Sequence, residues 1–75
     1  MIPQFIDLKY FLVICETQNF SRASERLGVV QPTLSKAMVR LEDIAGVPLL
    51  IRHSSGVRVT RAGEVLRLQA QELVT

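Results

Sequence analysis

The sequence predicts a mainly α-helical domain of the winged helix-turn-helix class, and three observations support this prediction. A short helical segment ends at Gly28, and Gln31-Pro32 then opens a longer helical segment. Two aliphatic and β-branched runs follow, joined by a short polar connection that suits a hairpin. A last helical pattern reaches Thr75. With one more helix ahead of them, these elements form a three-helix core, a two-stranded wing and a C-terminal linker helix.

The first helix is expected to begin with Asp7 as its N-cap, because a carboxylate can accept hydrogen bonds from the free backbone N–H groups of a first turn. Leu8, Phe11, Leu12 and Cys15 then share one helical face at i, i+3, i+4 and i+7. Apolar residues also fall outside this face. We therefore expect a second contact, either with the last helix or with another subunit.

The second helix is expected to run from Ser21 to Leu27. Ser21 is the expected N-cap, and Phe20 before it can act as a hydrophobic staple. Gly28 is expected to end this helix, because glycine readily takes the left-handed conformation that a helix C-terminus commonly needs.

The third helix is expected at about 31–45. Pro32 suits its first turn, where a missing N–H costs little, and Gly46 followed by Pro48 predicts its end. One face of this helix is apolar and is expected to face the core; its residues are Leu34, Ala37, Met38, Leu41 and either Ile44 or Ala45.

The wing is expected at 49–60, with strands at 49–52 and 57–60 joined by the four residues 53–56. Thr60 is the expected N-cap of the final helix. The predicted domain boundaries are 1–60 for the winged helix-turn-helix and 61–75 for the start of a linker and dimerisation helix.

Length and composition limit the function classes. A chain of 75 residues allows one small core and leaves little room for a catalytic pocket. One histidine, one cysteine and no glycine-rich phosphate loop make neither a metal-ligand set nor a catalytic triad. We therefore expect no enzyme, no catalytic residues, no metal and no cofactor in this domain.

Charge is concentrated in the middle of the chain. From Arg22 to Arg61 there are seven basic and three acidic residues, 7 − 3 = +4, whereas the remainder has two basic and four acidic residues, 2 − 4 = −2. A basic centre is expected where a surface meets phosphates, and ordinary surface charge is the alternative.

The compartment is expected to be the cytoplasm. A lone cysteine, Cys15, cannot form an internal disulfide and is interpreted as a buried small hydrophobe. The apolar run from Tyr10 to Cys15 is too short for a signal sequence or a membrane span, so no membrane partner is expected.

Candidate DNA contacts follow from side-chain chemistry. The amide of Gln31 can pair bidentately with adenine, worth about 1–3 kcal/mol of discrimination. Thr33 can offer its methyl group to thymine, and Lys36 can reach guanine or a phosphate. Candidate phosphate contacts are Ser21, Arg22 and Ser35. Candidate wing cations are Arg52 and Arg58, with His53 as a weaker one.

Each of these residues has a plainer interpretation as a solvated surface group. Arg26 and Arg40 are expected to balance Glu25 and other nearby acids instead of contacting bases.

The last helix carries an apolar stripe. Ala62, Leu66, Ala70 and Leu73 lie at i, i+4, i+8 and i+11, with Val65 beside them. Such a stripe predicts either a partner helix in a dimer or packing against the first helix of the same chain.

The whole pattern resembles the N-terminal DNA-binding domain of LysR-type bacterial transcriptional regulators. The residues that carry the resemblance are spread over nearly the whole chain: Leu8, Tyr10, Phe11, Phe20-Ser21-Arg22-Ala23-Ser24, Leu27, Gln31-Pro32-Thr33-Leu34-Ser35-Lys36, Leu41-Glu42, Gly46-Val47-Pro48-Leu49, Arg52, Val59-Thr60 and Ala62-Gly63.

The resemblance implies a recognition helix in the major groove and a wing near the minor groove of double-stranded DNA. It places Gln31, Pro32, Thr33 and Lys36 against bases or the groove wall. It also implies a homodimer through the linker helix on an interrupted inverted repeat, and a tetramer for the full-length protein. A small-molecule co-inducer is expected only for an effector domain, which this chain lacks.

The sequence departs from the family pattern in three ways. Val30 stands where the family usually has a capping serine, and Leu50 stands where phenylalanine is common. Fewer arginines surround Ser55 and Gly56, so we expect a weaker grip on the minor groove.

A protein-interaction module without a nucleic-acid role is the alternative function. It would more often show exposed aromatic or leucine side chains at positions 31–33, where this chain has Gln31-Pro32-Thr33.

Overall fold

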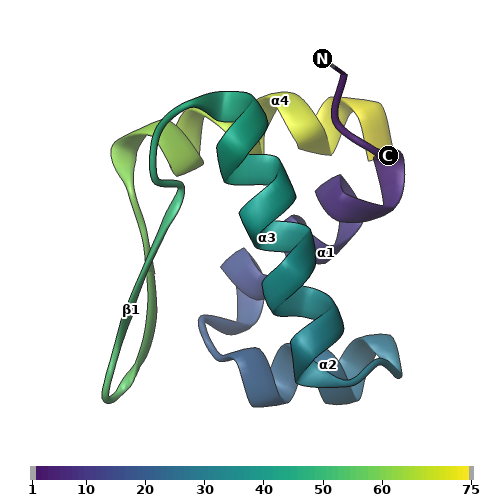
Figure 1. Cartoon of the computed structure of the whole chain (residues 1–75), viewed down its shortest axis with the longest axis vertical. Helices are drawn as coiled ribbons and strands as arrows, with labels where there is room; N and C mark the ends of the chain where they lie inside the picture. The colour runs from purple at the N-terminus through teal and green to yellow at the C-terminus, as the bar shows by residue number, and fades with distance from the viewer. Residues whose placement is uncertain (1, 75) are drawn as a thin grey trace.

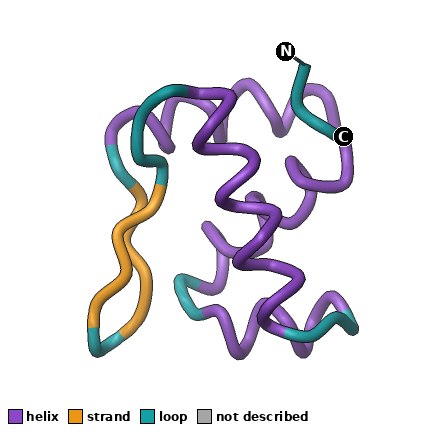
Figure 2. Tube along the Cα trace, viewed as in Figure 1, coloured by secondary structure: helices purple, strands orange, loops and turns teal. Residues whose placement is uncertain are grey.

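The computed structural model describes residues 2–74. The chain forms helices α1 (Phe5–Thr17), α2 (Phe20–Leu27), α3 (Gln31–Ala45) and α4 (Arg61–Val74) and strands β1 (Leu50–His53) and β2 (Gly56–Val59) (Figures 1 and 2). The predicted winged helix-turn-helix fold is confirmed.

Helix α1 lies at the centre of the helical layer and contacts α2, α3 and α4. The antiparallel hairpin β1–β2 lies beside α3, and its tip points to the end of the molecule where α2 lies and α3 begins (Figure 1). The register pairs Leu50 with Val59 and His53 with Gly56. This arrangement brings the start of α3 and the tip of the wing to one end of the molecule.

The core is built from the apolar faces that the sequence predicts. On α1, Leu8, Phe11 and Cys15 are buried and Leu12 packs against the core. The α3 face is buried as expected at Leu34, Ala37, Met38 and Leu41. Beyond them Ile44 is half-buried and Ala45 is exposed, so Ile44 continues the stripe.

The predicted cap of α1 is wrong. The N-cap residue is Gln4, which makes no side-chain cap hydrogen bond, and Asp7 lies inside the first turn. Asp7 is 1% exposed, and its two carboxylate oxygens accept from Nε and Nη2 of Arg40 at 3.0 and 2.9 Å. A long-range ion pair therefore occupies the carboxylate that local sequence assigns to a cap.

The predicted cap of α2 is also wrong. Asn19 is the N-cap, and its Oδ1 accepts from the backbone N–H of Arg22 at 2.9 Å. Phe20 is the first helical residue and its ring is buried, so Ser21 already lies in the first turn. Asparagine and serine are both good caps, and burial of the Phe20 ring selects the earlier start.

The C-terminal ends of α2 and α3 follow the prediction. Gly28 and Gly46 have φ of 69° and 74°, the left-handed conformation that ends α2 and α3. Val30 precedes α3 without any side-chain cap, and Pro32 lies in the first turn.

The hairpin connection is shorter than predicted. Pairing continues to His53 and Gly56, so Ser54 and Ser55 alone join the strands instead of four residues. Gly56 has φ of 141°, and a Cβ atom there would lie 2.7 Å from the carbonyl oxygen of Gln18. The N–H of Val57 donates to that same oxygen at 2.9 Å. The tip of the wing is thereby held against the α1–α2 junction.

Helix α4 begins as predicted, with the N–H of Gly63 donating to Thr60 Oγ1 at 3.0 Å. Ala70 is fully buried, and Ala62 and Leu66 pack against the core. These residues give α1 the second apolar contact that its sequence predicts, here with α4 of the same chain.

Candidate nucleic-acid interface

The first turns of α3 present a polar, solvent-facing surface. Gln31, Pro32, Thr33 and Lys36 are all exposed. These first turns of α3 lie at the end of the molecule that also carries the tip of the wing (Figure 1). The buried stripe of α3 lies on the other side of the helix, so the predicted base-contact residues are free to meet a ligand.

Ser21 and Gln31 contact each other across the turn between α2 and α3. Nε2 of Gln31 donates a hydrogen bond to Oγ of Ser21 at 2.9 Å. Arg22 is exposed beside Ser21. Two residues expected to contact different parts of a duplex are therefore joined.

Arg52 lies against the helices. Its guanidinium stacks over the ring of Phe20, 3.7 Å from the centroid, and its Nη2 donates to Oγ of Ser35 at 2.5 Å. A cation–π contact at an exposed site contributes about 0.5–1 kcal/mol. The cation that the sequence assigns to the wing is thus fixed between β1, α2 and α3.

The tip of the wing carries a second polar pair, since Oγ of Ser55 and Nδ1 of His53 are 2.8 Å apart. An open cleft of about 400 Å³ is lined by residues of the wing and of the starts of α2 and α3. Its lining is mostly polar and consists of Asn19, Phe20, Ser21, Gln31, Arg52, His53, Ser54, Ser55, Gly56 and Val57. The structure therefore brings together Ser21, Gln31, Arg52 and His53. Lys36 and Arg58 are exposed outside this cleft.

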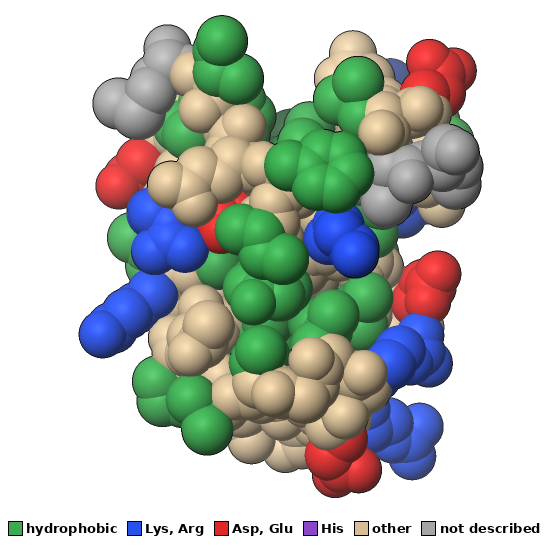
Figure 3. Space-filling model, turned by 90° about the vertical axis from the view of Figure 1, so that its right-hand side faces the viewer, with side chains coloured by type: hydrophobic (Ala, Val, Ile, Leu, Met, Phe, Trp, Pro, Cys, Tyr) green, Lys and Arg blue, Asp and Glu red, His purple; other side chains and the backbone are tan. Residues whose placement is uncertain are grey.

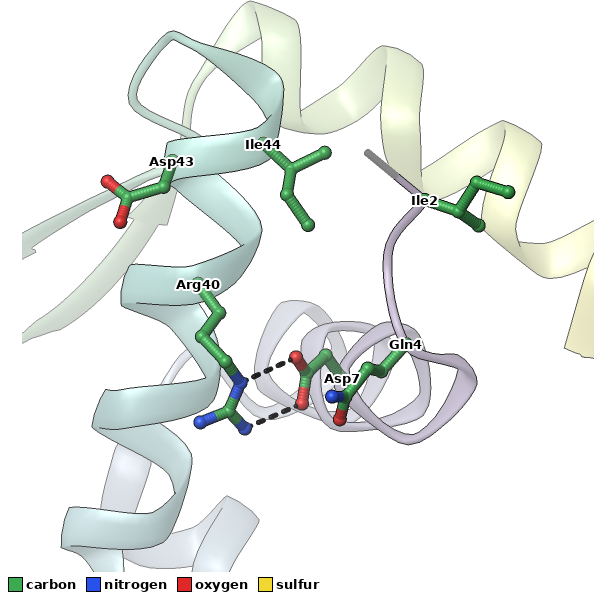
Figure 4. A pocket seen from close by; sticks show the side chains of 6 residues that line it. All are labelled: Ile2, Gln4, Asp7, Arg40, Asp43 and Ile44. Carbon is green, nitrogen blue, oxygen red and sulfur yellow. Dashed lines mark hydrogen bonds and ion pairs between the residues drawn. The ribbon is translucent and has the colours of Figure 1, made fainter.

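Two carboxylates set the position of α3. Asp7 of α1 holds Arg40, and this pairing raises the pKa of the guanidinium above its usual value. The pair lies in a pocket of about 560 Å³ that Ile2, Gln4, Asp43 and Ile44 also line (Figure 4).

On the wing side of α3, Oε2 of Glu42 accepts from the backbone N–H groups of Leu49 and Leu50 at 2.7 and 3.2 Å. The start of the wing is thereby tied to α3. Neither this contact nor the Asp7–Arg40 pair is visible in local sequence patterns.

Arg26 balances an acid, as predicted, but not its neighbour Glu25. It pairs with Glu16 of α1 at 2.6 Å, and both side chains are more than half exposed. The expected balance with Glu25 would have stayed within α2. The observed pair instead links α2 to α1.

A comparison with known families decides the identity of this domain. Residues 5–64 match the family described as bacterial regulatory helix-turn-helix proteins of the lysR family. The chain belongs to this family. The expected resemblance is confirmed, and the chain is a LysR-type helix-turn-helix DNA-binding domain of transcriptional regulators.

Curated relatives agree with this assignment. The HTH-type transcriptional regulator BudR of Raoultella terrigena is 43% identical over 67 residues, which cover 89% of this chain and 23% of BudR. A probable cat1 operon transcriptional activator of Acinetobacter lwoffii is 41% identical, over 88% of this chain and 22% of its own length. The chain therefore spans less than a quarter of these relatives.

Solved structures include DNA-bound domains of the same fold. The DNA-binding domain of CbnR in complex with DNA has a TM-score of 0.92 and 37% identity, covering 95% of this chain and 82% of that one. The BenM DNA-binding domain on catB site 1 DNA has a TM-score of 0.89 and 34% identity, covering 95% and 80%. These findings favour DNA binding over a protein-interaction module.

Across residues 2–74, none of the helices combines the length and the apolar character that a membrane span needs. Within the same range, no three histidine, cysteine, aspartate or glutamate side chains are grouped as a metal site would require.

Proposed function

We propose that this domain reads specific sequences in double-stranded DNA, with α3 in the major groove and the wing near the adjacent minor groove. The exposed polar start of α3, at the same end of the molecule as the wing tip, carries this proposal. An α-helix fits the major groove, where each base pair presents a distinct pattern of donors and acceptors.

The roles follow from where the side chains lie. Gln31, Pro32, Thr33 and Lys36 meet base edges or the groove wall, because they cover the exposed first turns of α3. Phosphate contacts come from Ser21 and Arg22 at the start of α2 and from Ser35. Val30 provides no side-chain cap, Pro32 has no N–H, and the N–H of Thr33 donates to the carbonyl oxygen of Val30. The backbone donor that we propose for a phosphate at the start of α3 is therefore the N–H of Gln31.

The charged and polar residues of the wing have two different roles in DNA binding. Arg52 braces Ser35 and directs its remaining N–H donors to the phosphate backbone beside α3. His53 lies one pair nearer the tip than Arg52, and Arg58 lies one pair farther from it, opposite Ile51. We propose that these two side chains contact the region of the minor groove, with Arg58 as the cation. No arginine stands at the Ser54-Ser55 turn, so this grip is weak.

Dimerisation is proposed through α4. Three of its five candidate residues, Ala62, Leu66 and Ala70, pack against the core, while Val65 and Leu73 are 54% and 67% exposed. Leu68 is also exposed. Hydrophobic side chains gather in the middle of the face that Figure 3 shows. The exposed large apolar residues of the N-terminal segment and α1 are Ile2, Phe5 and Ile6.

Family membership supports several wider proposals for the protein that carries this domain. It acts in the cytoplasm as a dimer or tetramer on an interrupted inverted repeat, and a small-molecule co-inducer binds outside this domain. Residues 1–60 form the DNA-reading unit, and residues 61–75 begin the linker. The relatives are transcriptional regulators, and we propose no catalytic role here.

Selection from a random duplex pool tests the proposal. We expect the chain to enrich an inverted repeat whose half-sites lie about one helical turn, or a multiple of it, apart. Retention of DNA without sequence enrichment, lost as salt rises, would refute base reading. No retention by a folded sample would refute DNA binding by this chain.

The division between base and phosphate contacts has its own test. Gln31→Ala should relax base preference in the selected site, whereas Arg22→Ala should weaken binding similarly on every sequence. Equal losses on all sequences for both variants would contradict the proposed roles.

A further inference from the structure

The side chains of Ser21 and Gln31 are held together although neither is buried. Both are exposed, and Nε2 of Gln31 donates to Oγ of Ser21 at 2.9 Å. Burial does not force this contact. It arises because α2 and α3 begin close to each other, at the edge of the cleft that faces the wing.

The backbone around both residues is fixed. Asn19 caps α2 immediately before the buried ring of Phe20, which sets the position of Ser21. Gln31 precedes Pro32, and the residue before a proline is restricted in its backbone conformation. The hydroxyl and the amide therefore start from defined positions.

We propose that Ser21 determines base specificity by orienting the amide of Gln31; this inference rests on the proposed base-reading role of Gln31. A glutamine amide has two N–H donors and one acceptor oxygen. Ser21 occupies one N–H, so Gln31 presents Oε1 and a single remaining N–H to the groove. The hydroxyl hydrogen of Ser21 stays available for a phosphate.

The orientation favours adenine and disfavours guanine. Adenine presents a donor and an acceptor in the major groove, which match one acceptor and one donor on Gln31. Guanine presents two acceptors, N7 and O6, and a free amide can offer them its two N–H groups. With one N–H held by Ser21, the amide cannot do so.

The test uses the duplex that the wild-type chain selects and its three variants at the base pair where Gln31→Ala loses preference. Affinities are measured by fluorescence anisotropy for Ser21→Ala, for Ser21→Thr, which keeps the hydroxyl, and for Ser24→Ala as a control on the same helix. We expect Ser21→Ala to lower the preference for adenine over guanine about tenfold. Ser21→Thr and Ser24→Ala should retain that preference.

The double variant Ser21→Ala/Gln31→Ala should lose no more discrimination than Gln31→Ala, because both changes act through one amide. A uniform loss of affinity in Ser21→Ala, with the preference intact, would overturn the inference and leave Gln31 as a base reader. A base other than adenine at that position would overturn it too. An unchanged preference in Gln31→Ala would instead refute the base-reading proposal itself, and with it this inference.

Discussion

Glu42 joins the wing to α3. We expect that removing its side chain destabilises the fold more than the loss of a half-buried side chain usually does. One carboxylate oxygen accepts from the N–H of buried Leu49 at 2.7 Å and from that of Leu50 at 3.2 Å. A hydrogen bond to a charged group contributes about 1.5–3 kcal/mol, and the longer bond adds less than the shorter one. Glu42→Ala should therefore lower the free energy of unfolding by about 2–3 kcal/mol.

This loss is large for a small domain. At about 0.05–0.15 kcal/mol per residue, 75 residues give a total stability of about 4–11 kcal/mol. Since 1 kcal/mol shifts the Tm of such a domain by about 4–8 °C, Glu42→Ala should lower Tm by about 8–24 °C. Glu42→Gln keeps an acceptor oxygen without the charge and should lose roughly half as much.

Urea unfolding followed by far-UV circular dichroism measures the effect, with an unchanged m-value as the sign of two-state behaviour. Glu25→Ala is the matched control, because Glu25 is an exposed glutamate on α2. It should stay within about 0.5 kcal/mol of the wild type. If Glu42→Ala is no more destabilising than Glu25→Ala, the carboxylate does not hold the wing.

Three further outcomes are expected. Arg22→Ala should reduce the slope of log affinity against log salt by about 1, measured by anisotropy; an unchanged slope would contradict a phosphate contact. Gly63→Ala should cost about 1–3 kcal/mol in urea unfolding, because its Cβ would meet the carbonyl oxygen of Leu49, and a neutral effect would refute this close approach. Burial raises the pKa of the Cys15 thiol from 9.0 to about 12, so between these pH values the unfolded chain loses a proton that the folded chain keeps. The free energy of unfolding should therefore fall as pH rises across that window, and it should fall less steeply in Cys15→Ala. If the two proteins show parallel curves of unfolding free energy against pH, the raised pKa of Cys15 is contradicted.

The order of elements is predictable because its signals are local. Gly28 and Gly46 end their helices through backbone conformations that glycine favours, and Pro32 marks a first turn. The apolar faces of α1 and α3 follow from helical periodicity alone. The same local rules failed where tertiary contacts compete, since Asp7 pairs with Arg40 and the ring of Phe20 moves the start of α2.

The candidate site divides in the same way. The exposed start of α3 could be predicted because Gln31-Pro32-Thr33 has no apolar periodicity to bury it. The position of Arg52 could not, because it depends on Phe20 and Ser35, which are far away in sequence. The side-chain pairing of Gln31 with Ser21 likewise appears only once α2 and α3 are placed together.

The most direct test of the account is an NMR titration of the isotope-labelled chain with its selected duplex, following each backbone amide. We expect the largest shift changes at the start of α2, the first turns of α3 and the tip of the wing, with little change on the outer face of α4. Changes concentrated on α4 and the N-terminal part of α1, with α3 unaffected, would contradict DNA reading by α3.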